Sequence, residues 1–110
     1  MIDKSNTKSY TLCIGKRKEK ILVEWDANKA EVNLRKHGIS FDTAALVFAD
    51  EERIEHYDRL HSSSDEDRYI VLGMVEDVLF VVFTERADAL RLISARVATS
   101  YERNVYYGNS

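Results

Sequence analysis

Hydrophobic positions along the chain change their spacing near residue 50. Before it, Phe41, Ala44, Ala45 and Phe48 lie at positions i, i+3, i+4 and i+7, the spacing of one helix face. After it, apolar residues alternate with polar ones or form short continuous runs, as in strands. The pattern predicts helices over 27–37 and 41–48, strands over 53–57, 69–74, 78–85 and 90–97, and a short last helix containing 102–107.

Residues that start and stop helices support these boundaries. Asp26 and Ser40 are suited to accept hydrogen bonds from the free N–H groups at a helix start, and Gly38 is suited to the left-handed conformation that ends a helix. The order of the elements predicts an α+β fold. It has two N-terminal helices, a four-stranded antiparallel β-meander with the helices packed on one face, and a short C-terminal helix.

The first 20 residues carry weaker signals, and two interpretations stay open. Residues 10–14 and 21–24 are candidate strands of a hairpin that turns at Gly15. The alternative is a disordered basic extension, because residues 1–9 are mostly polar. We therefore divide the chain into an N-terminal extension, residues 1–20, that is flexible or a hairpin, and a single domain over residues 21–110.

Composition limits the class of protein. With 110 residues, 45% hydrophobic and 32% charged, the chain has the composition of one globular domain. A single cysteine, Cys13, excludes an internal disulfide and a cysteine-rich zinc site. The longest apolar run, 78–83, is far shorter than the roughly 20 residues that span a bilayer, and the N-terminus has no apolar signal core. We expect a soluble, cytoplasmic protein that does not contact a membrane.

Charge is distributed unevenly along the chain. The net charge of −3 argues against a protein dedicated to binding a phosphate backbone, since such proteins are usually basic. Residues 1–20 hold six basic and two acidic residues, and the other 90 residues hold 10 basic and 17 acidic ones. Eight of the acids lie within residues 50–67, so local fields matter more than the net charge.

The sequence Arg35-Lys36-His37-Gly38 is the first candidate site. Lys36 and His37 are suited to position and protonate a phosphate ester, because imidazole titrates near neutral pH. The same residues suit a helix C-terminus, where cations interact favourably with the last carbonyl groups. On the sequence alone the capping interpretation is favoured.

Arginines on the last strands form the second candidate site: Arg68, Arg86, Arg91 and Arg96. Guanidinium groups bind phosphate oxygens in pairs and stabilise charge on a phosphoryl group in transfer. Arg91 and Arg96 lie five positions apart, so in a regular strand they point to opposite faces. Both serve one site only if the strand bulges or if one of them lies at its end. The alternative is a solvated face, or ion pairs with the acids of residues 50–67.

Other chemistry is weakly supported. Tyr106 is suited to stack on a nucleic-acid base, and its alternative is a place at the edge of the core. His37, His56 and His61 lack metal-ligand spacing and a cysteine partner, and the chain has no glycine-rich phosphate loop. We expect neither a metal nor another cofactor.

Taken in order, these segments resemble one known family, the BrnT-type toxins. Val23-Glu24-Trp25-Asp26, Lys29, Asn33 and Lys36-His37-Gly38-Ile39-Ser40-Phe41 resemble the opening of its members. The later matches are Ala44, Val47-Phe48, Asp58, Arg68, Gly73, Thr84, Arg86, Arg91, Ile93-Ser94-Ala95-Arg96, Ala98, Glu102-Arg103 and Tyr106. The resemblance covers about residues 22–107, and the ordered set with its gaps is specific although each piece is weak alone.

The resemblance implies a function. BrnT-type proteins are the toxins of bacterial type II toxin–antitoxin pairs, with a RelE-like ribonuclease fold, and they block translation by cleaving RNA. Their partner is a BrnA-type antitoxin with a ribbon-helix-helix part that binds DNA, so the toxin meets DNA only through the antitoxin. We therefore expect an RNA substrate and an antitoxin of this type.

The leading hypothesis is a metal-independent endoribonuclease, because RNA supplies its own nucleophile in the 2′-OH. We expect one concave face of the sheet to carry the catalytic residues Lys36, His37, Arg68, Arg86 and Arg96. Arg91 and Tyr106 are the expected substrate-binding residues. The alternative is a catalytically weak or inactive relative that binds the antitoxin and tunes promoter repression. The arrangement of the arginines distinguishes the two hypotheses. Arginines that converge in one groove support the enzyme, and arginines that are each paired with a carboxylate far from the others support the binding protein.

Overall fold

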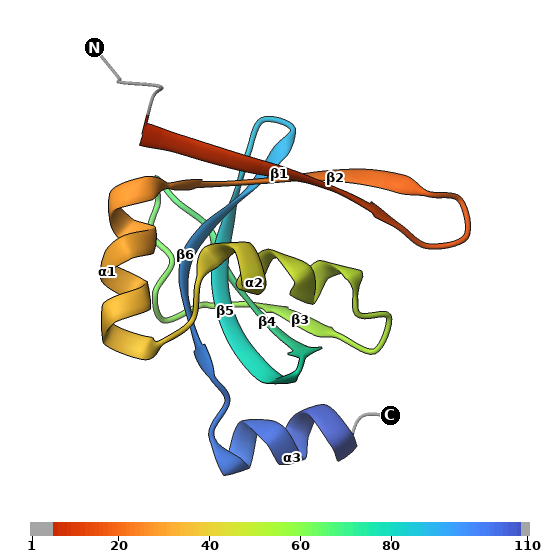
Figure 1. Ribbon diagram of the computed structural model, residues 1–110. Coiled ribbons are helices and arrows are strands. Elements are labelled where there is room, and N and C mark those ends of the chain that lie inside the picture. The colour runs from red at the N-terminus through yellow and green to blue at the C-terminus, as the bar shows by residue number, and fades with distance from the viewer. Residues whose placement is uncertain (1–5, 109–110) are drawn as a thin grey trace.

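The computed structural model describes residues 6–108, which form a single sheet flanked by helices (Figure 1). The chain begins with a hairpin of β1 (Thr7–Ile14) and β2 (Glu19–Asp26), followed by α1 (Ala27–His37), α2 (Phe41–Ala45) and the 3₁₀ helix η2 (Leu46–Ala49). Next come β3 (Ile54–Tyr57), β4 (Arg68–Val75), β5 (Asp77–Arg86), β6 (Ala89–Val97) and α3 (Ser100–Gly108). The strand order is β1-β2-β6-β5-β4-β3, with β2 parallel to β6 and the other neighbours antiparallel.

The predicted arrangement of two helices followed by a four-stranded antiparallel meander is wrong. The sheet is six-stranded and mixed, because the hairpin precedes the helices and pairs in parallel with β6 through residues 22–24 and 89–91. β2 and β6 are separated by more than 60 residues, so they come together only when the helices and strands between them have packed into the fold. Local alternation of apolar residues contains no information about that pairing. The elements predicted after residue 26 are present, although the helix predicted over 41–48 continues from Ala45 as a 3₁₀ helix.

The predicted helix caps are confirmed. The Asp26 carboxylate accepts hydrogen bonds from the N–H groups of Asn28 and Lys29 at 2.7 and 3.3 Å. Gly38 has φ of 74° and donates its N–H to the Leu34 carbonyl, which ends α1. These contacts fix where α1 starts and stops, and so which of its side chains face the sheet.

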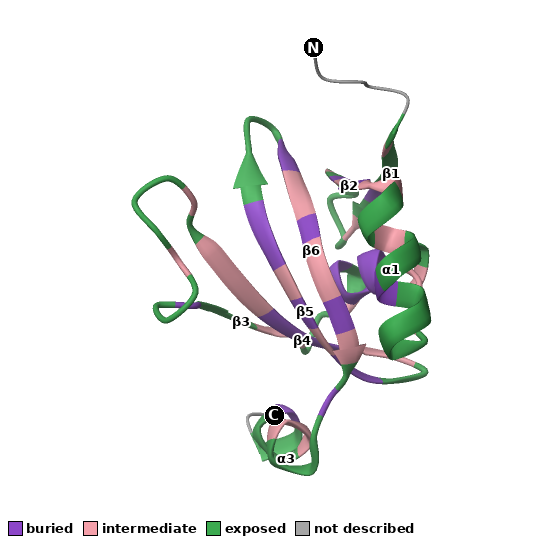
Figure 2. Ribbon diagram, turned by 90° about the vertical axis from the view of Figure 1, so that its left-hand side faces the viewer, coloured by how far each residue is buried: buried purple, intermediate pink, exposed green. Residues whose placement is uncertain are grey.

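The two faces of the sheet differ in what covers them (Figure 2). Apolar residues of α2 and η2, among them Phe41 and Phe48, pack on one face in a core with Val81 and Phe83. On the other face α3 covers one end, where Tyr106 belongs to a second cluster with Leu72, Val78 and Ala98. We call the rest of this second face the open face. Side-chain alternation and cross-strand pairing assign to it Arg68, Ile70, Val82, Thr84, Arg91 and Ser94.

A bulge in β6 sets which of its side chains reach the open face. The register with β5 shifts between Val82, which pairs with Ser94, and Phe83, which pairs with Leu92, so Ile93 is an extra residue. Because of this extra residue, Arg91 and Arg96 lie on the same face although they are five positions apart. The structure therefore has the bulge that a shared site for these two arginines requires.

Candidate functional site

Two arginines flank a threonine on three adjacent strands of the open face. Arg68 on β4 pairs with Thr84 on β5, and Thr84 pairs with Arg91 on β6. Neighbouring strands lie about 4.8 Å apart, so the backbones of the two arginines are separated by about 10 Å. The Thr84 hydroxyl donates to the Asp67 carbonyl at 2.6 Å. Thr84 itself is buried, so a phosphodiester group on this face would contact the flanking arginines and not the threonine hydroxyl.

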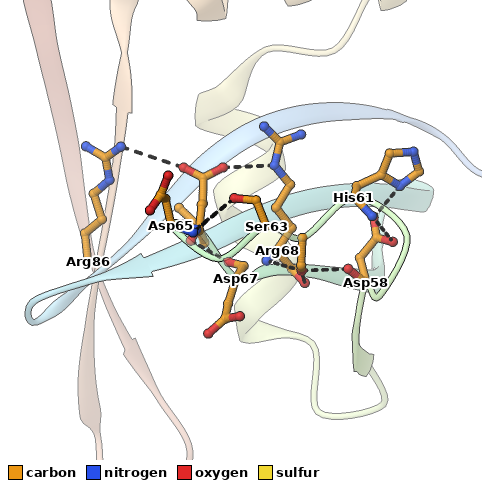
Figure 3. A network of polar contacts seen from close by, with 10 residues as sticks. Asp58, His61, Ser63, Asp65, Asp67, Arg68 and Arg86 are labelled. Atoms are coloured by element: carbon orange, nitrogen blue, oxygen red, sulfur yellow. Dashed lines mark hydrogen bonds and ion pairs between the residues drawn. The ribbon is translucent and has the colours of Figure 1, made fainter.

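Arg86 joins this row through a carboxylate that it shares with Arg68. Glu66 accepts a hydrogen bond from Nε of Arg68 at 2.9 Å, and its other oxygen lies 3.8 Å from an amino nitrogen of Arg86 (Figure 3). The side chains of Arg68 and Arg86 are 37% and 58% exposed, so an anion in solution can reach both. A phosphate group has the charge and the paired oxygens to replace Glu66 between them.

The loop that carries Glu66 is held by hydrogen bonds. The Ser62 hydroxyl donates to the Asp58 carbonyl at 2.7 Å and accepts from the Arg68 N–H at 2.8 Å. The Ser63 hydroxyl accepts from the Glu66 N–H at 3.1 Å, in the same network (Figure 3). These bonds fasten the loop to the start of β4 and keep Glu66 beside the arginines.

Arg91 also has a carboxylate partner. Glu24 on β2 stands next to it in the parallel register, and the Glu24 carboxylate accepts from Arg91 at 2.7 Å. The two side chains are only 19% and 22% exposed, so this pair is better shielded from solvent than the pair at Glu66. The hairpin therefore brings a carboxylate to Arg91 as well as a strand to the sheet.

Arg96 lies on the same face but at its other end. It pairs across the strands with Phe80, four residues before Thr84 and so about 13 Å from it along β5. Glu102 accepts two hydrogen bonds from Arg96, at 2.8 and 2.9 Å, and the guanidinium carbon lies 3.9 Å from the centroid of the Phe80 ring. The hydrogen bond to Glu102 raises the pKa of Arg96 against the opposing effect of burial, and the same bond lowers the pKa of Glu102. The pair ties β6 to the start of α3, and a catalytic role for Arg96 stays a prediction.

Lys36 and His37 lie beside the edge of β6, at the end of α1. Together with Ile93 and Ser94 they line a groove between this helix and the strand. Ser94 belongs to the open face as well, so the groove adjoins the arginine row from the side. The structure thus groups Arg68, Arg86 and Arg91, and it places Arg96 and the Lys36–His37 pair at two different borders of that group.

Tyr106, the predicted stacking residue, is 7% exposed. Its hydroxyl donates to the Asp50 carboxylate at 2.5 Å. Burial, together with this bond to a carboxylate, raises the pKa of Tyr106 to about 12. Burial alone would raise the pKa of Asp50, but hydrogen bonds from Tyr106 and from the Met74 N–H outweigh it and lower the value. The Tyr106 ring extends from α3 into the core cluster with Leu72 and Val78. This agrees with the alternative interpretation of the sequence, a place at the edge of the core.

Two further features concern residues 6–108, the part of the chain that the structure describes. That part of the chain contains no group of three His, Cys, Asp or Glu side chains placed to hold a metal ion. None of its helices has the length and apolar character needed to cross a membrane.

Sequence comparison identifies the family. A family model described as the ribonuclease toxin BrnT of type II toxin–antitoxin systems matches residues 25–102, well over half of the chain. The chain belongs to the BrnT family. The predicted resemblance is therefore confirmed, and membership implies ribonuclease activity and an antitoxin partner.

The fold agrees with that of a solved BrnT toxin. A crystal structure of the Brucella abortus ribonuclease toxin BrnT matches with a TM-score of 0.51 and 23% sequence identity, over 69% of this chain and 94% of that chain. No curated protein matches this chain. The BrnT family match contains Arg96 and the three arginines of the row but begins at Trp25, so β1 and most of β2 lie outside it.

Three residues beside the arginines were assigned no site role from the sequence, although Glu24 and Thr84 lie in the motifs that resemble the family: Glu24, Glu66 and Thr84. Thr84 did carry a signal, because it is a polar residue in an otherwise apolar run on a predicted central strand. Glu66 was one of eight acids in residues 50–67, with nothing local to select it. Glu24 lies 67 positions from Arg91, and only the sheet brings the two together.

Proposed function

We propose that this protein is a metal-independent endoribonuclease that cleaves RNA on the open face, acts in the cytoplasm and thereby inhibits translation. The observation that carries the proposal is the grouping of Arg68, Arg86 and Arg91 around the buried Thr84, with the side chains of Arg68 and Arg86 open to solvent. Their carboxylate partners occupy the place where substrate phosphates would bind. Membership of the ribonuclease toxin family supports the same reaction class.

The chemistry needs little from the protein because RNA carries its own nucleophile. The 2′-oxygen attacks the adjacent phosphorus, the bond from phosphorus to the 5′-oxygen of the next nucleotide breaks, and a 2′,3′-cyclic phosphate forms. A base takes the 2′-OH proton and an acid donates a proton to the leaving oxygen. We assign stabilisation of the phosphoryl charge to the arginines, including Arg96, and proton transfer to Lys36 or His37 at the border of the open face.

Induced expression tests the enzymatic part of the proposal. Arg68→Ala removes one of the two arginines that flank Thr84, and loss of one such donor commonly lowers a rate by about 10²–10³. We expect it to abolish growth arrest and RNA cleavage without changing the circular dichroism spectrum. Arg103→Ala is the matched control, because Arg103 lies on α3 and pairs with Asp77 at the start of β5, away from the row, so this variant should stay toxic. If Arg68→Ala remains as toxic as this control, the open face is not the active site.

We further propose that the partner is a BrnA-type antitoxin with a ribbon-helix-helix part, and that the toxin meets DNA only through it. The support is the type II toxin–antitoxin family and the acidic stretch of residues 50–67, which suits a basic partner segment. Co-expression with the neighbouring gene should yield a complex that survives size-exclusion chromatography at micromolar concentration. Free monomer alone would contradict this part of the proposal.

A second candidate function is favoured by one specific observation: Arg68, Arg91 and Arg96 each have a carboxylate partner within 3 Å. Under this reading the chain is a catalytically weak relative that binds the antitoxin and tunes promoter repression. Intact RNA and normal growth under induction, together with a stable antitoxin complex, would select this function over the enzymatic one.

A further inference from the structure

The groove between α1 and β6 has a volume of about 330 Å³ and combines two kinds of lining. Val32 and Ile93 form an apolar surface, and Lys29, Lys36 and His37 add cationic groups. Val32 is 56% exposed, so its side chain is available to a ligand in the groove. An apolar surface bordered by cations suits a ligand with a flat apolar part and an anionic part.

The groove is held open by the way α1 meets the sheet. β2 pairs with β6 only as far as Arg91. Beyond Arg91, the side-chain amide of Asn33 forms hydrogen bonds with the backbone of β6 in place of a neighbouring strand. Asn33 donates to the Ala95 carbonyl at 2.8 Å and accepts from the Ala95 N–H at 3.1 Å. Ile93, the extra residue of the bulge, lines the groove at this point. The backbone around the groove is therefore fixed before any ligand arrives.

Charge distinguishes this groove from the arginine row. Lys29, Lys36 and His37 are exposed and have no ion pair or hydrogen bond through their side chains with any residue in the described part of the chain. The arginines of the row are held by Glu66 and Glu24. An incoming phosphate therefore displaces no carboxylate when it binds at the groove.

We propose that this groove binds one nucleotide of the RNA, next to the nucleotide whose phosphate lies over Thr84. The base lies against Val32 and Ile93, and Lys29 contacts the phosphate of this nucleotide. Ser94 links the groove to the row, because it pairs with Val82, two residues or about 7 Å along β5 from Thr84. The proposal rests on the proposed function for the identity of the ligand as RNA.

Nucleotide titration tests the groove without reference to cleavage. The probes are the four ribonucleoside 5′-monophosphates, the matching nucleosides and inorganic phosphate, added to the full chain and followed by backbone amide NMR. We expect the monophosphates to cause saturable shifts of the amide signals of Val32, Ile93 and Ser94. The nucleosides and inorganic phosphate should each bind more weakly than the monophosphates. Shifts confined to the row at Arg68 and Thr84 would overturn the proposal.

Two surface variants of α1 provide a matched pair. Val32→Glu puts a negative charge in the groove, and we expect it to weaken monophosphate binding at least tenfold. Leu34→Glu is the control, because Leu34 is 47% exposed on the same helix but does not line this groove. Equal affinity of the two variants would overturn the proposal. A thermal melt of each confirms that the helix is intact.

An RNA oligonucleotide with 2′-O-methyl groups separates this inference from the proposed function, since it binds but cannot react. Lys29→Ala should lower the slope of log affinity against log salt by about 0.7, the value for one phosphate contact on a single strand. Lys16→Ala, in the turn of the hairpin, should leave the slope unchanged. An unchanged slope for Lys29→Ala refutes the groove even if unmodified RNA is cleaved. If the slope changes as expected but unmodified RNA is not cleaved, the result supports RNA binding at the groove and refutes the proposed ribonuclease activity.

Discussion

Asn33→Ala should destabilise the protein more than any other single truncation on α1. The Asn33 side chain is 6% exposed and makes three hydrogen bonds. It donates to the Ala95 carbonyl at 2.8 Å and to the Ile39 carbonyl at 3.0 Å, and it accepts from the Ala95 N–H at 3.1 Å. Alanine removes all three and leaves both backbone groups of Ala95 without a partner at the edge of β6.

The magnitude follows from these contacts. A typical hydrogen bond contributes about 0.5–1.5 kcal/mol net, and a buried backbone group left unpaired costs about 1–3 kcal/mol. The higher helix propensity of alanine offsets up to about 0.7 kcal/mol. We expect a loss of roughly 3 kcal/mol in the free energy of unfolding. For a domain of this size that corresponds to a fall in Tm of about 10–20 °C.

Urea denaturation provides the assay. Trp25 is the only tryptophan and is 4% exposed, so its fluorescence reports on the core beside α1. Asn104→Ala, an exposed position on α3, is the control and should change stability by less than about 0.5 kcal/mol. Hydrogen exchange at the Ala95 amide should also accelerate in Asn33→Ala. If Asn33→Ala unfolds at the same urea concentration as this control, apolar packing rather than the amide holds α1 to the sheet.

Two further predictions concern other parts of the fold. Gly73→Ala should cost about 1–3 kcal/mol in urea denaturation, because an added Cβ would lie 2.7 Å from Cβ of Val47, whereas Gly108→Ala meets no atom within 4 Å and should be neutral. Glu102→Gln should destabilise the protein by roughly 1 kcal/mol at neutral pH, a figure reduced by the partial exposure of Arg96. Because hydrogen bonding to Arg96 lowers the pKa of Glu102 below its ordinary 4.5, this contribution is present above pH 4.5 and lost as the pH falls through the folded-state value. Melting curves from pH 7 downward should therefore converge for Glu102→Gln and the wild type, and a constant gap would contradict the assignment.

Local chemistry in the sequence determined the individual elements. Asp26 and Gly38 fix the ends of α1 because their cap contacts involve residues within four positions of each cap. The position and type of the later strands follow from alternation of apolar residues, which depends only on neighbouring positions. The sequence also contained the arginines and the ordered motifs that place the chain in the BrnT family.

Tertiary structure decided how these elements and groups meet. The parallel pairing of β2 with β6 joins segments about 67 positions apart, so no local pattern encodes it, and the predicted meander failed for this reason. The bulge at Ile93 put Arg91 and Arg96 on one face, where the sequence could state only the condition for it. Strand register and loop geometry decide which carboxylates lie beside the arginines. Glu66 is one of eight acids in residues 50–67, and no local sequence feature distinguishes it from the others. Residue type sets what a side chain can bind, and the packed sheet alone sets which partner is within reach.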